Sequence, residues 1–510
     1  MLAKVNSGYV IGVNAQAVDV EVDVTNGMPS FLVVGLPDAS IRESRNRIRS
    51  AIKNSGFAFP ETRITVNLSP ADIKKEGVGF DLPIALGILG ATSALKQEEL
   101  DNILFCGELS LNGKLKHFRG ALPIAMSLNT KFKTFILPTA NALEAANIDN
   151  ISVYGAGNLR EVIDHLKKIT PLTQTVINKN TYFNTNSQTE LDFKDVKGQH
   201  HIKRGLEVAA SGNHNVLLLG PPGSGKSMLA KRFPSILPDL SLKESLETTN
   251  IYSVTGQTKN SGLIRERPFR SPHHTISYAA MAGGGSYPLP GEISLAHNGV
   301  LFLDEFPEFR RDVLETLRQP LESGKITIAR AQRSLQYPSR FVLIAAMNPC
   351  PCGYFTDKLK KCQCSPYQIQ RYLSKISGPL LDRIDLHLEV PRLDYTDLSK
   401  KRTGENSENI KKRVTANRQL QNNRFKNKKR SSAYNAYMSQ KDIEMFCPLT
   451  STAEALLKKA ILELGISARA YDKILKISRT IADMANSETI DTPHISEAIG
   501  YRSLDKNLWV

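Results

Sequence analysis

Residues 211–229 read SGNHNVLLLGPPGSGKSML, and this stretch decides the fold of the chain around it. The apolar run VLLLG predicts a buried strand, and the apolar residues after the loop predict the start of a helix. The loop between them, Gly220-Pro221-Pro222-Gly223-Ser224-Gly225-Lys226-Ser227, has the P-loop pattern in its strand–loop–helix setting. We therefore predict an α/β fold with a phosphate-binding turn after this strand.

The P-loop residues have separate roles in this prediction. Gly223 and Gly225 let backbone N–H groups approach phosphate oxygens. Lys226 would reach the β- and γ-phosphates of a nucleotide, and Ser227 would ligate Mg²⁺. The alternative is a chance glycine-rich turn, and the flanking strand and helix patterns argue against it. We expect ATP and Mg²⁺ as cofactors.

Two further apolar runs end in polar residues. GVLFLDEF (299–306) predicts a strand ending at Asp304 and Glu305, and FVLIAAMN (341–348) predicts one ending at Asn348. Asp304 would hold Mg²⁺ through water, and Glu305 would polarise the attacking water. Asn348 would orient that water or sense the γ-phosphate. Because ligands of open α/β sheets bind at the carboxyl ends of the strands, these runs and the P-loop predict one site.

These motifs together resemble an AAA+ ATPase, with a Walker A loop, a DE-type Walker B strand and a sensor-1 asparagine. SGPLLDRIDLHLEV (377–390) resembles the stretch that carries the arginine finger, at Arg383. GISARAYDKILKISRTIAD (465–483) resembles the α-helical lid, with sensor 2 at Arg469. The finger acts on the nucleotide of a neighbouring chain, so the resemblance implies self-association into a hexameric ring.

Two inserted segments narrow the resemblance. FRSPHHTISYAAMAGGG (269–285) and LESGKITIARAQRSLQYPSR (321–340) resemble the helix-2 insert and the pre-sensor-1 hairpin of magnesium chelatases and MCM helicases. With the N-terminal block, the whole chain resembles the magnesium-chelatase-like ComM/YifB family, which is tied to DNA uptake and recombination in bacteria. In the helicases this hairpin projects into the central channel, which implies that Arg330 and Arg333 contact DNA phosphates.

The resemblance implies an ATP-driven DNA motor that promotes branch migration in homologous recombination and natural transformation. Its DNA partner would be single-stranded or branched. A chelatase-type ATPase that remodels a protein partner is the alternative function. DNA-stimulated ATP hydrolysis would separate the two.

The N-terminal block resembles a protease without having its chemistry. NLSPADIKKEGVGFDLPIALGIL (67–89) and CGELSLNGKLKHFRGALPIAM (106–126) resemble the proteolytic domain of Lon. That domain needs a serine nucleophile and a lysine that assists its deprotonation. The positions that match them here are Gly79 and Leu122, which can fill neither role. We expect a binding or assembly scaffold and no peptidase activity.

Composition shifts divide the chain into five parts. Together with the resemblances above, these shifts imply a Lon-like α/β domain over 1–165, a linker over 166–191, an AAA+ core over 192–395, a basic linker over 396–435 and a helical lid over 436–510. The net charge is +16, and residues 400–430 hold twelve Lys or Arg against two Glu. Such a run predicts a solvated, mobile linker, with a phosphate-attracting arm as the alternative.

Four of the six cysteines lie in NPCPCGYFTDKLKKCQC (348–364), directly after the third strand. Two close pairs across a short polar loop, Cys350, Cys352, Cys362 and Cys364, can set four thiolates around one Zn²⁺. Free structural thiols or a redox pair are the alternatives. His273 and His274 are expected to be insert-loop residues and not metal ligands.

Composition excludes several other classes of protein. Hydrophobic residues make up 41% and charged residues 23%, as in ordinary globular proteins. The N-terminus alternates like a strand and does not resemble a secretory signal, and no stretch is apolar for the length of a membrane span. Cys106 and Cys447 are isolated, so no disulfide framework is expected. We expect a cytoplasmic protein with no membrane partner.

Overall fold

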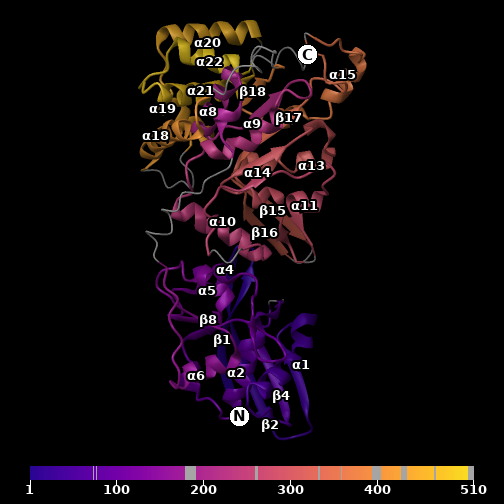
Figure 1. Ribbon diagram of the computed structural model, residues 1–510, viewed down its shortest axis with the longest axis vertical. Helices are drawn as coiled ribbons and strands as arrows, with labels where there is room; N and C mark the ends of the chain where they lie inside the picture. The colour runs from indigo at the N-terminus through magenta and orange to yellow at the C-terminus, as the bar shows by residue number, and fades with distance from the viewer. Residues whose placement is uncertain are drawn as a thin grey trace. The chain divides into compact units, whose positions relative to one another are not determined.

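The structure is a computed structural model that describes residues 1–72, 74–75, 77–177, 191–258, 262–285, 287–330, 333–355, 357, 359–392, 404–426, 434–464 and 467–502. The chain forms two compact units, and both are discontinuous in sequence. The first consists of Met1–Asn186 and Ser241–Arg265, and the second of Ser187–Leu240 and Glu266–Val510. Figure 1 colours both along the chain.

The first unit is built on a seven-stranded mixed sheet of order β3-β4-β2-β1-β5-β8-β9. The antiparallel pairs β1–β2 and β2–β4 are followed on either side by parallel pairs. The strands are β1 (Leu2–Ile11), β2 (Asn14–Thr25), β3 (Ser30–Val34), β4 (Arg63–Ser69), β5 (Ile103–Phe105), β8 (Thr134–Pro138) and β9 (Ser152–Ala156), with a small hairpin of β6 (Glu108–Leu109) and β7 (Leu115–Lys116).

The helices of this unit include one that is apolar on all sides. This helix, α2 (Asp81–Ala91), packs on β1 and β2 and is buried on every face, as expected for an all-apolar helix. The other helices are α1 (Ala39–Asn54), α3 (Gln97–Leu100), α4 (Ala121–Leu128), α5 (Thr139–Ala145) and α6 (Leu159–Leu166).

The segment Ser241–Arg265 belongs to the first unit, although it lies inside the range 192–395 that sequence predicts as one core. Its helix α10 (Leu242–Thr255) packs against α4. Asn250 Nδ2 donates to the Val13 carbonyl at 2.8 Å. The tertiary contacts of α10, and not its place in the chain, therefore decide the unit in which this segment packs.

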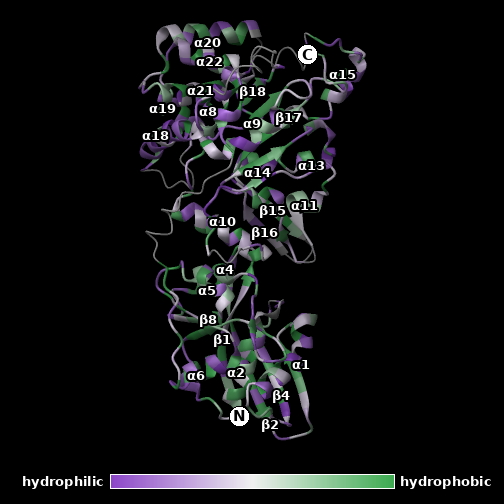
Figure 2. Cartoon of the chain, in the orientation of Figure 1, coloured by the Kyte–Doolittle hydropathy of each residue, from purple (hydrophilic) through white to green (hydrophobic). Residues whose placement is uncertain are grey.

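The second unit contains a parallel five-stranded sheet of order β11-β14-β17-β10-β18. Every residue of β10, β14 and β17 is buried, as in α/β sheets with both faces covered. Figure 2 shows the apolar character of β17. Their bounds are β11 (Phe269–Arg270), β14 (Val300–Leu303), β17 (Val342–Met347), β10 (Val216–Leu219) and β18 (Leu386–Glu389).

Helices and two small hairpins surround this sheet. The helices are α8 (His200–Gly212), α9 (Lys226–Arg232), α11 (Tyr278–Ala282), α12 (Glu292–Leu295), α13 (Arg311–Glu315), α14 (Arg318–Ser323), α15 (Pro366–Leu373) and α16 (Gly378–Leu381). The hairpins are β12 (Gly283–Gly284) with β13 (Leu289–Pro290), and β15 (Lys325–Arg330) with β16 (Arg333–Pro338). The C-terminal helices are α18 (Ser407–Phe425), α19 (Gln440–Phe446), α20 (Ser451–Leu464), α21 (Ala468–Met484) and α22 (Thr492–Gly500).

The basic stretch 396–435 is not the solvated linker that its charge predicts. Residues 393–403 and 427–433 lie outside the described residues, but between them α18 packs on α8 and α21. Ile410, Val414 and Phe425 are buried on one face of it. This apolar stripe is hard to see in the sequence, because buried polar residues occupy the positions between Val414 and Phe425.

Those buried polar residues bond to the backbone of α8. Arg418 donates from Nε and Nη2 to the Ala210 carbonyl at 2.9 and 2.7 Å, and Gln421 Nε2 donates to the Ser211 carbonyl at 3.0 Å. Buried polar groups are tolerated when they are hydrogen-bonded in this way. Arginines that count as linker charge in the sequence thus hold a helix to the core.

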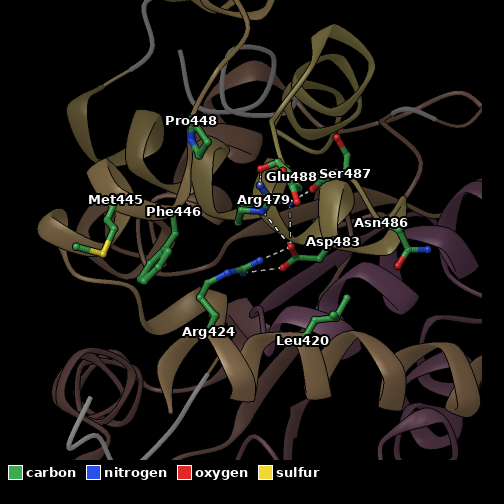
Figure 3. Close-up of a pocket in the computed structure, with 10 residues that line it drawn as sticks. All are labelled: Leu420, Arg424, Met445, Phe446, Pro448, Arg479, Asp483, Asn486, Ser487 and Glu488. Atoms are coloured by element: carbon green, nitrogen blue, oxygen red, sulfur yellow. Dashed lines mark hydrogen bonds and ion pairs between the residues drawn. The ribbon is translucent and has the colours of Figure 1, made fainter. Parts of the chain in front are cut away.

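A pocket of about 410 Å³ lies beside the end of α18 (Figure 3). Arg424 of α18 and Arg479 of α21 both bond Asp483, and Arg424 Nη1 lies 2.8 Å from the carboxylate. The pocket is lined by Leu420, Arg424, Met445, Phe446, Pro448, Arg479, Asp483, Asn486, Ser487 and Glu488. Since its central arginines and aspartate pair with one another, the pocket marks a structural ion network between the two helices.

Within the described residues, none of the helices combines the length and the apolar character that crossing a membrane requires.

Candidate nucleotide-binding site

Three parallel strands of the second unit end side by side. In the register of the sheet, Leu219 at the end of β10 pairs with Met347 at the end of β17. Leu303 at the end of β14 pairs with Ala345 of β17. Three motifs therefore follow the carboxyl ends of neighbouring strands, as the sequence predicts: the P-loop, the Asp304–Glu305 pair and Asn348.

The P-loop needs glycine at its conformationally demanding positions. Gly223 and Gly225 have φ of +76° and +91°, where a side chain is disfavoured. A Cβ on Gly220 would lie 2.2 Å from the Val390 carbonyl oxygen, so the loop packs too closely there for any other residue. The loop then enters α9 at Lys226, so the positive end of the helix dipole lies at the loop.

Lys226 is the cation of this site, and it is nearly buried. Its Nζ donates to the carbonyls of Gly220 and Pro221 at 2.7 and 2.9 Å and to Asn348 Oδ1 at 3.1 Å. Burial lowers its pKa to about 8, although the nearby Asp304 favours the charged form. Phosphate oxygens would be stronger partners for this ammonium group than the two carbonyls.

Ser227 and Asp304 form the oxygen pair of the site. Ser227 Oγ donates to Asp304 Oδ2 at 2.6 Å, across 77 residues of sequence. A hydroxyl and a carboxylate are ligands that suit the hard cation Mg²⁺, which keeps several waters and takes few protein ligands. The residues present therefore fit the Mg²⁺ that the P-loop implies.

Glu305 projects from a tight turn at the end of β14. Its φ is +52°, and its side chain is 60% exposed. His274 Nδ1 lies 3.2 Å from Glu305 Oε2, and the His273 ring lies 4.1 Å from the His274 ring. Sequence reasoning assigned both histidines only to the insert loop, so the contact with Glu305 was missed; the position of the insert in the chain gives no sign of it.

Tyr372 of α15 is a second residue that sequence reasoning missed. Burial together with the charge of Glu308 raises the pKa of its hydroxyl above the ordinary range, and the nearby backbone of Asn348 acts in the opposite direction. Nothing in the local sequence of α15 indicates this contact. Asn348 thus accepts a hydrogen bond from Lys226 at its side chain and has Tyr372 near its backbone.

The two candidate arginines lie near one another and bond to acids. Arg383 Nη2 lies 2.5 Å from Glu322 Oε2 of α14, and its Nη1 donates to the Pro379 carbonyl at 2.7 Å. Arg469, at the start of α21, lies 3.4 Å from Asp382 Oδ2 and is 68% exposed. These partners, two acids and a backbone carbonyl, all lie outside the P-loop.

The predicted hairpin is present. β15 and β16 are antiparallel, and Arg330 pairs with Arg333 next to the tip. Residues 331–332 and the side chains of Arg330 and Arg333 lie outside the described residues. Tyr337 anchors the base of the hairpin, since it is buried and its hydroxyl donates to the Pro288 carbonyl at 2.6 Å.

The four loop cysteines come together in space. Cys350 Sγ lies 3.3 Å from Cys352 Sγ and 3.7 Å from Cys362 Sγ. The sulfurs of all four, with Cys364, lie within 4.8 Å of one another, and none of them is in a disulfide. Such a cluster could hold a metal ion.

Neither of the two positions that match the protease dyad offers a reactive side chain. Gly79 lies in the turn of residues 78–80, and a Cβ there would meet Phe118 at 3.5 Å. Leu122 is fully buried in α4, and its N–H donates to Glu144 Oε1 at 3.0 Å.

Known families and proteins match this chain over almost its full length. Residues 192–398 match the family described as "Magnesium chelatase, subunit ChlI", residues 20–141 match "Subunit ChlI of Mg-chelatase", and residues 404–502 match "Magnesium chelatase, subunit ChlI C-terminal". "Competence protein ComM" of Haemophilus influenzae is 44% identical over 506 residues, which cover 99% of this chain and 98% of that protein.

The chain belongs to the magnesium-chelatase-like ComM/YifB family. "Uncharacterized protein YifB" of Escherichia coli is 43% identical over 511 residues, 99% of this chain and 98% of that protein. "Probable DNA helicase MCM9" of Arabidopsis thaliana is 28% identical over 191 residues, which are 37% of this chain and 24% of that protein. The family and the parallel sheet with its P-loop agree with an AAA+ magnesium-chelatase-like fold.

Proposed function

We propose that this protein is an ATP-driven, ring-forming DNA motor that promotes branch migration in recombination and natural transformation. The observation that carries the proposal is the meeting of Lys226, Asp304 and Asn348 at one sheet edge. The full-length similarity to a competence protein and the partial similarity to a helicase support DNA as the partner. Such a motor would work in the cytoplasm, where ATP and DNA meet.

ATP hydrolysis would use residues already in position. Lys226 binds the β- and γ-phosphate oxygens, and the Ser227–Asp304 pair holds Mg²⁺, whose charge offsets that of the phosphates. Glu305 polarises the attacking water, because its exposed carboxylate follows the Mg²⁺-side aspartate directly. Asn348 orients the same water or senses the γ-phosphate through its bond to Lys226. The same protein would carry a structural zinc ion on Cys350, Cys352, Cys362 and Cys364.

Arg383 would act on the nucleotide of a neighbouring chain, and Arg469 would act as the sensor-2 arginine of the lid. Both lie around the segment that contains Asp382, and their contacts are with acids and a carbonyl outside the P-loop. A cation placed next to a neighbour's γ-phosphate would offset charge in the transition state. This role needs an oligomer, and a closed ring gives every nucleotide such a neighbour. We propose a hexamer.

The β15–β16 hairpin would grip DNA through Arg330 and Arg333. It is inserted between the Walker B strand β14 and the sensor strand β17, so a change at the γ-phosphate can reach it directly. Arginine contacts to successive phosphates carry no sequence information, as a motor that moves along any sequence requires. The first unit, with Gly79 and Leu122 at the dyad positions, would be a Lon-like scaffold without peptidase activity.

The test is ATP hydrolysis by the purified protein with and without single-stranded and branched DNA. We expect DNA to stimulate hydrolysis. We also expect ATP-dependent branch migration that converts a mobile four-way junction into two duplexes. Lys226→Ala should abolish both activities. Hydrolysis that is lost in Lys226→Ala but is indifferent to every DNA would contradict the motor. That outcome would favour the chelatase-type alternative, an ATPase that remodels a protein partner, which the name of the matching family also suggests.

A further inference from the structure

The cysteine loop has the geometry of a site for a single metal ion. The Sγ atoms of Cys350, Cys352 and Cys362 are separated from one another by 3.3, 3.7 and 3.6 Å. Four sulfurs at about 2.3 Å from one tetrahedral zinc ion are about 3.8 Å apart. A multi-iron cluster spreads its cysteines around several metal atoms and so needs a wider separation than this. One tetrahedral ion fits the four sulfurs best.

The loop has no apolar core of its own. Its large apolar side chains, Phe355 and Leu359, are 47% and 74% exposed. The N–H of Cys364 donates to Cys362 Sγ at 3.4 Å, a contact within the cysteine pair itself. Without burial to offset the entropy of ordering the loop, a metal bond is the interaction that can hold it.

The first cysteine pair lies against the nucleotide site. Cys350 is fully buried two residues after Asn348. At Gly353, where φ is +85°, an added Cβ would lie 2.6 Å from Pro222 Cδ of the P-loop and 3.8 Å from Asn348 Cγ. The turn that carries Cys350 and Cys352 therefore touches both the phosphate loop and the sensor.

The second cysteine pair, Cys362 and Cys364, is connected to Asn348 through helix α15. Cys364 directly precedes Ser365, the N-cap of α15, which forms a capping box with Gln368. One further turn along α15, the Tyr372 hydroxyl lies close enough to the backbone of Asn348 for that backbone to influence the pKa of the hydroxyl. Both ends of the cysteine loop thus meet at Asn348, and a metal ion between the pairs closes this ring of contacts.

We propose that one zinc ion bound by Cys350, Cys352, Cys362 and Cys364 clamps the loop and positions Pro222 and Asn348 for nucleotide hydrolysis. The inference about hydrolysis rests on the proposed ATPase function, whereas zinc binding does not. Zinc has no redox chemistry and its four positions are filled by cysteine, so its role is to hold the site and not to react. Loss of zinc should lower kcat more than it raises KM, because Lys226 and Ser227 keep their places.

The experiment compares the full-length protein with a Cys362→Ser, Cys364→Ser variant. These are the cysteines farther along the chain from the P-loop. The matched control is Cys106→Ala, Cys447→Ala, which removes the two isolated cysteines. Metal content is measured on protein purified without added metal, alongside ATP hydrolysis. We expect about one zinc per chain in the wild type and the control, and none in the cysteine-pair variant.

We expect kcat for ATP to fall about 10–100-fold in that variant, as when a group that orients a reactive site is lost. Wild-type protein stripped of zinc by a chelator should show the same fall, and added Zn²⁺ should restore it, so misfolding of the variant cannot explain the result. A wild type without zinc, or with iron in its place, would overturn the site. Zinc at about one per chain with full hydrolysis after stripping would overturn its positioning role. Zinc present in a wild type that hydrolyses no ATP would contradict the proposed ATPase function instead, and with it the positioning role, but not the zinc site.

Discussion

Glu305 and His274 are in contact, yet only one of them was found from its sequence pattern. Glu305 follows an apolar strand and an aspartate, so its proposed role can be predicted from the neighbouring residues in the sequence. His274 is 31 positions earlier and meets it only because the insert folds back over the end of β14. A side chain that touches the carboxylate of Glu305 belongs to the candidate site, whatever its distance in sequence.

Replacing Glu305 with glutamine should keep ATP binding and block turnover. The amide cannot polarise the attacking water, while Lys226 and the Ser227–Asp304 pair stay in place. We expect hydrolysis to fall about 10²–10⁴-fold, the usual contribution of a general base. Steady-state ATPase assays and binding of a fluorescent ATP analogue check this. Asp312→Asn, at an exposed acid downstream of the site, is the control, and near-normal hydrolysis by Glu305→Gln would remove Glu305 from the mechanism.

Among the elements, the β15–β16 hairpin carries the prediction about DNA. Alanine at both Arg330 and Arg333 should abolish branch migration and DNA-stimulated hydrolysis, while basal hydrolysis and ring assembly survive. The slope of the logarithm of DNA affinity against the logarithm of salt concentration should become shallower, by the amount expected for the loss of about two phosphate contacts per chain. Branch-migration assays on a mobile junction measure the first effect, and DNA-binding titrations over a range of salt concentrations measure the second.

The control for the hairpin must remove charge while leaving α18 in the chain. Deleting the whole basic stretch would not serve, because α18 packs against α8 and α21. Alanine at Lys428, Lys429 and Arg430 removes more charge than the hairpin variant does. If this control loses branch migration and the hairpin variant keeps it, the hairpin assignment is wrong.

The helix α18 is the element whose role changed most between sequence and structure. Arg418→Met should destabilise the protein by about 1.5–3 kcal/mol, because the Ala210 carbonyl loses two charge-assisted hydrogen bonds in a buried place. Thermal unfolding of the second unit measures the effect. Lys412→Met is the matched control, since Lys412 is 69% exposed and its ion-pair partner Glu408 is 72% exposed. Equal melting of both variants would mean that α18 contributes little to the fold.

At the scale of the whole molecule, the prediction concerns assembly. Arg383→Ala should bind ATP and fail to hydrolyse it, and Lys226→Ala should fail at both. Mixed in equal amounts, the two should recover part of the activity, because random mixing in a ring gives about one interface in four an intact P-loop facing an intact arginine. ATPase assays across mixing ratios check this. Absence of recovery at every ratio, with mixed oligomers shown to form, would argue against an arginine that acts in trans.

The sequence alone determined the order of the motifs and their meeting at the carboxyl ends of the strands. Strand ends can be predicted because an apolar run followed by Gly220, Asp304 or Asn348 is a local pattern, and parallel strands bring their carboxyl ends together. The hairpin of Arg330 and Arg333 was predicted from the resemblance of residues 321–340 to the pre-sensor-1 hairpin of magnesium chelatases and MCM helicases. The family could be recognised because these motifs recur in fixed order.

Only the tertiary structure decided which distant residues touch. Lys226 and Asn348 meet across 122 residues, and the packing of α15 alone brings Tyr372 to the same asparagine. Charge composition predicted a linker where Arg418 is buried, because a count of charges does not say whether a neighbouring carbonyl is there to accept its hydrogen bonds. The same limit applies to the cysteines: their spacing allowed a metal site, but the closeness of four sulfurs depends on the path of the loop between them. Local patterns encode elements and their ends, whereas contacts between elements depend on how side chains pack, which no short stretch of sequence contains.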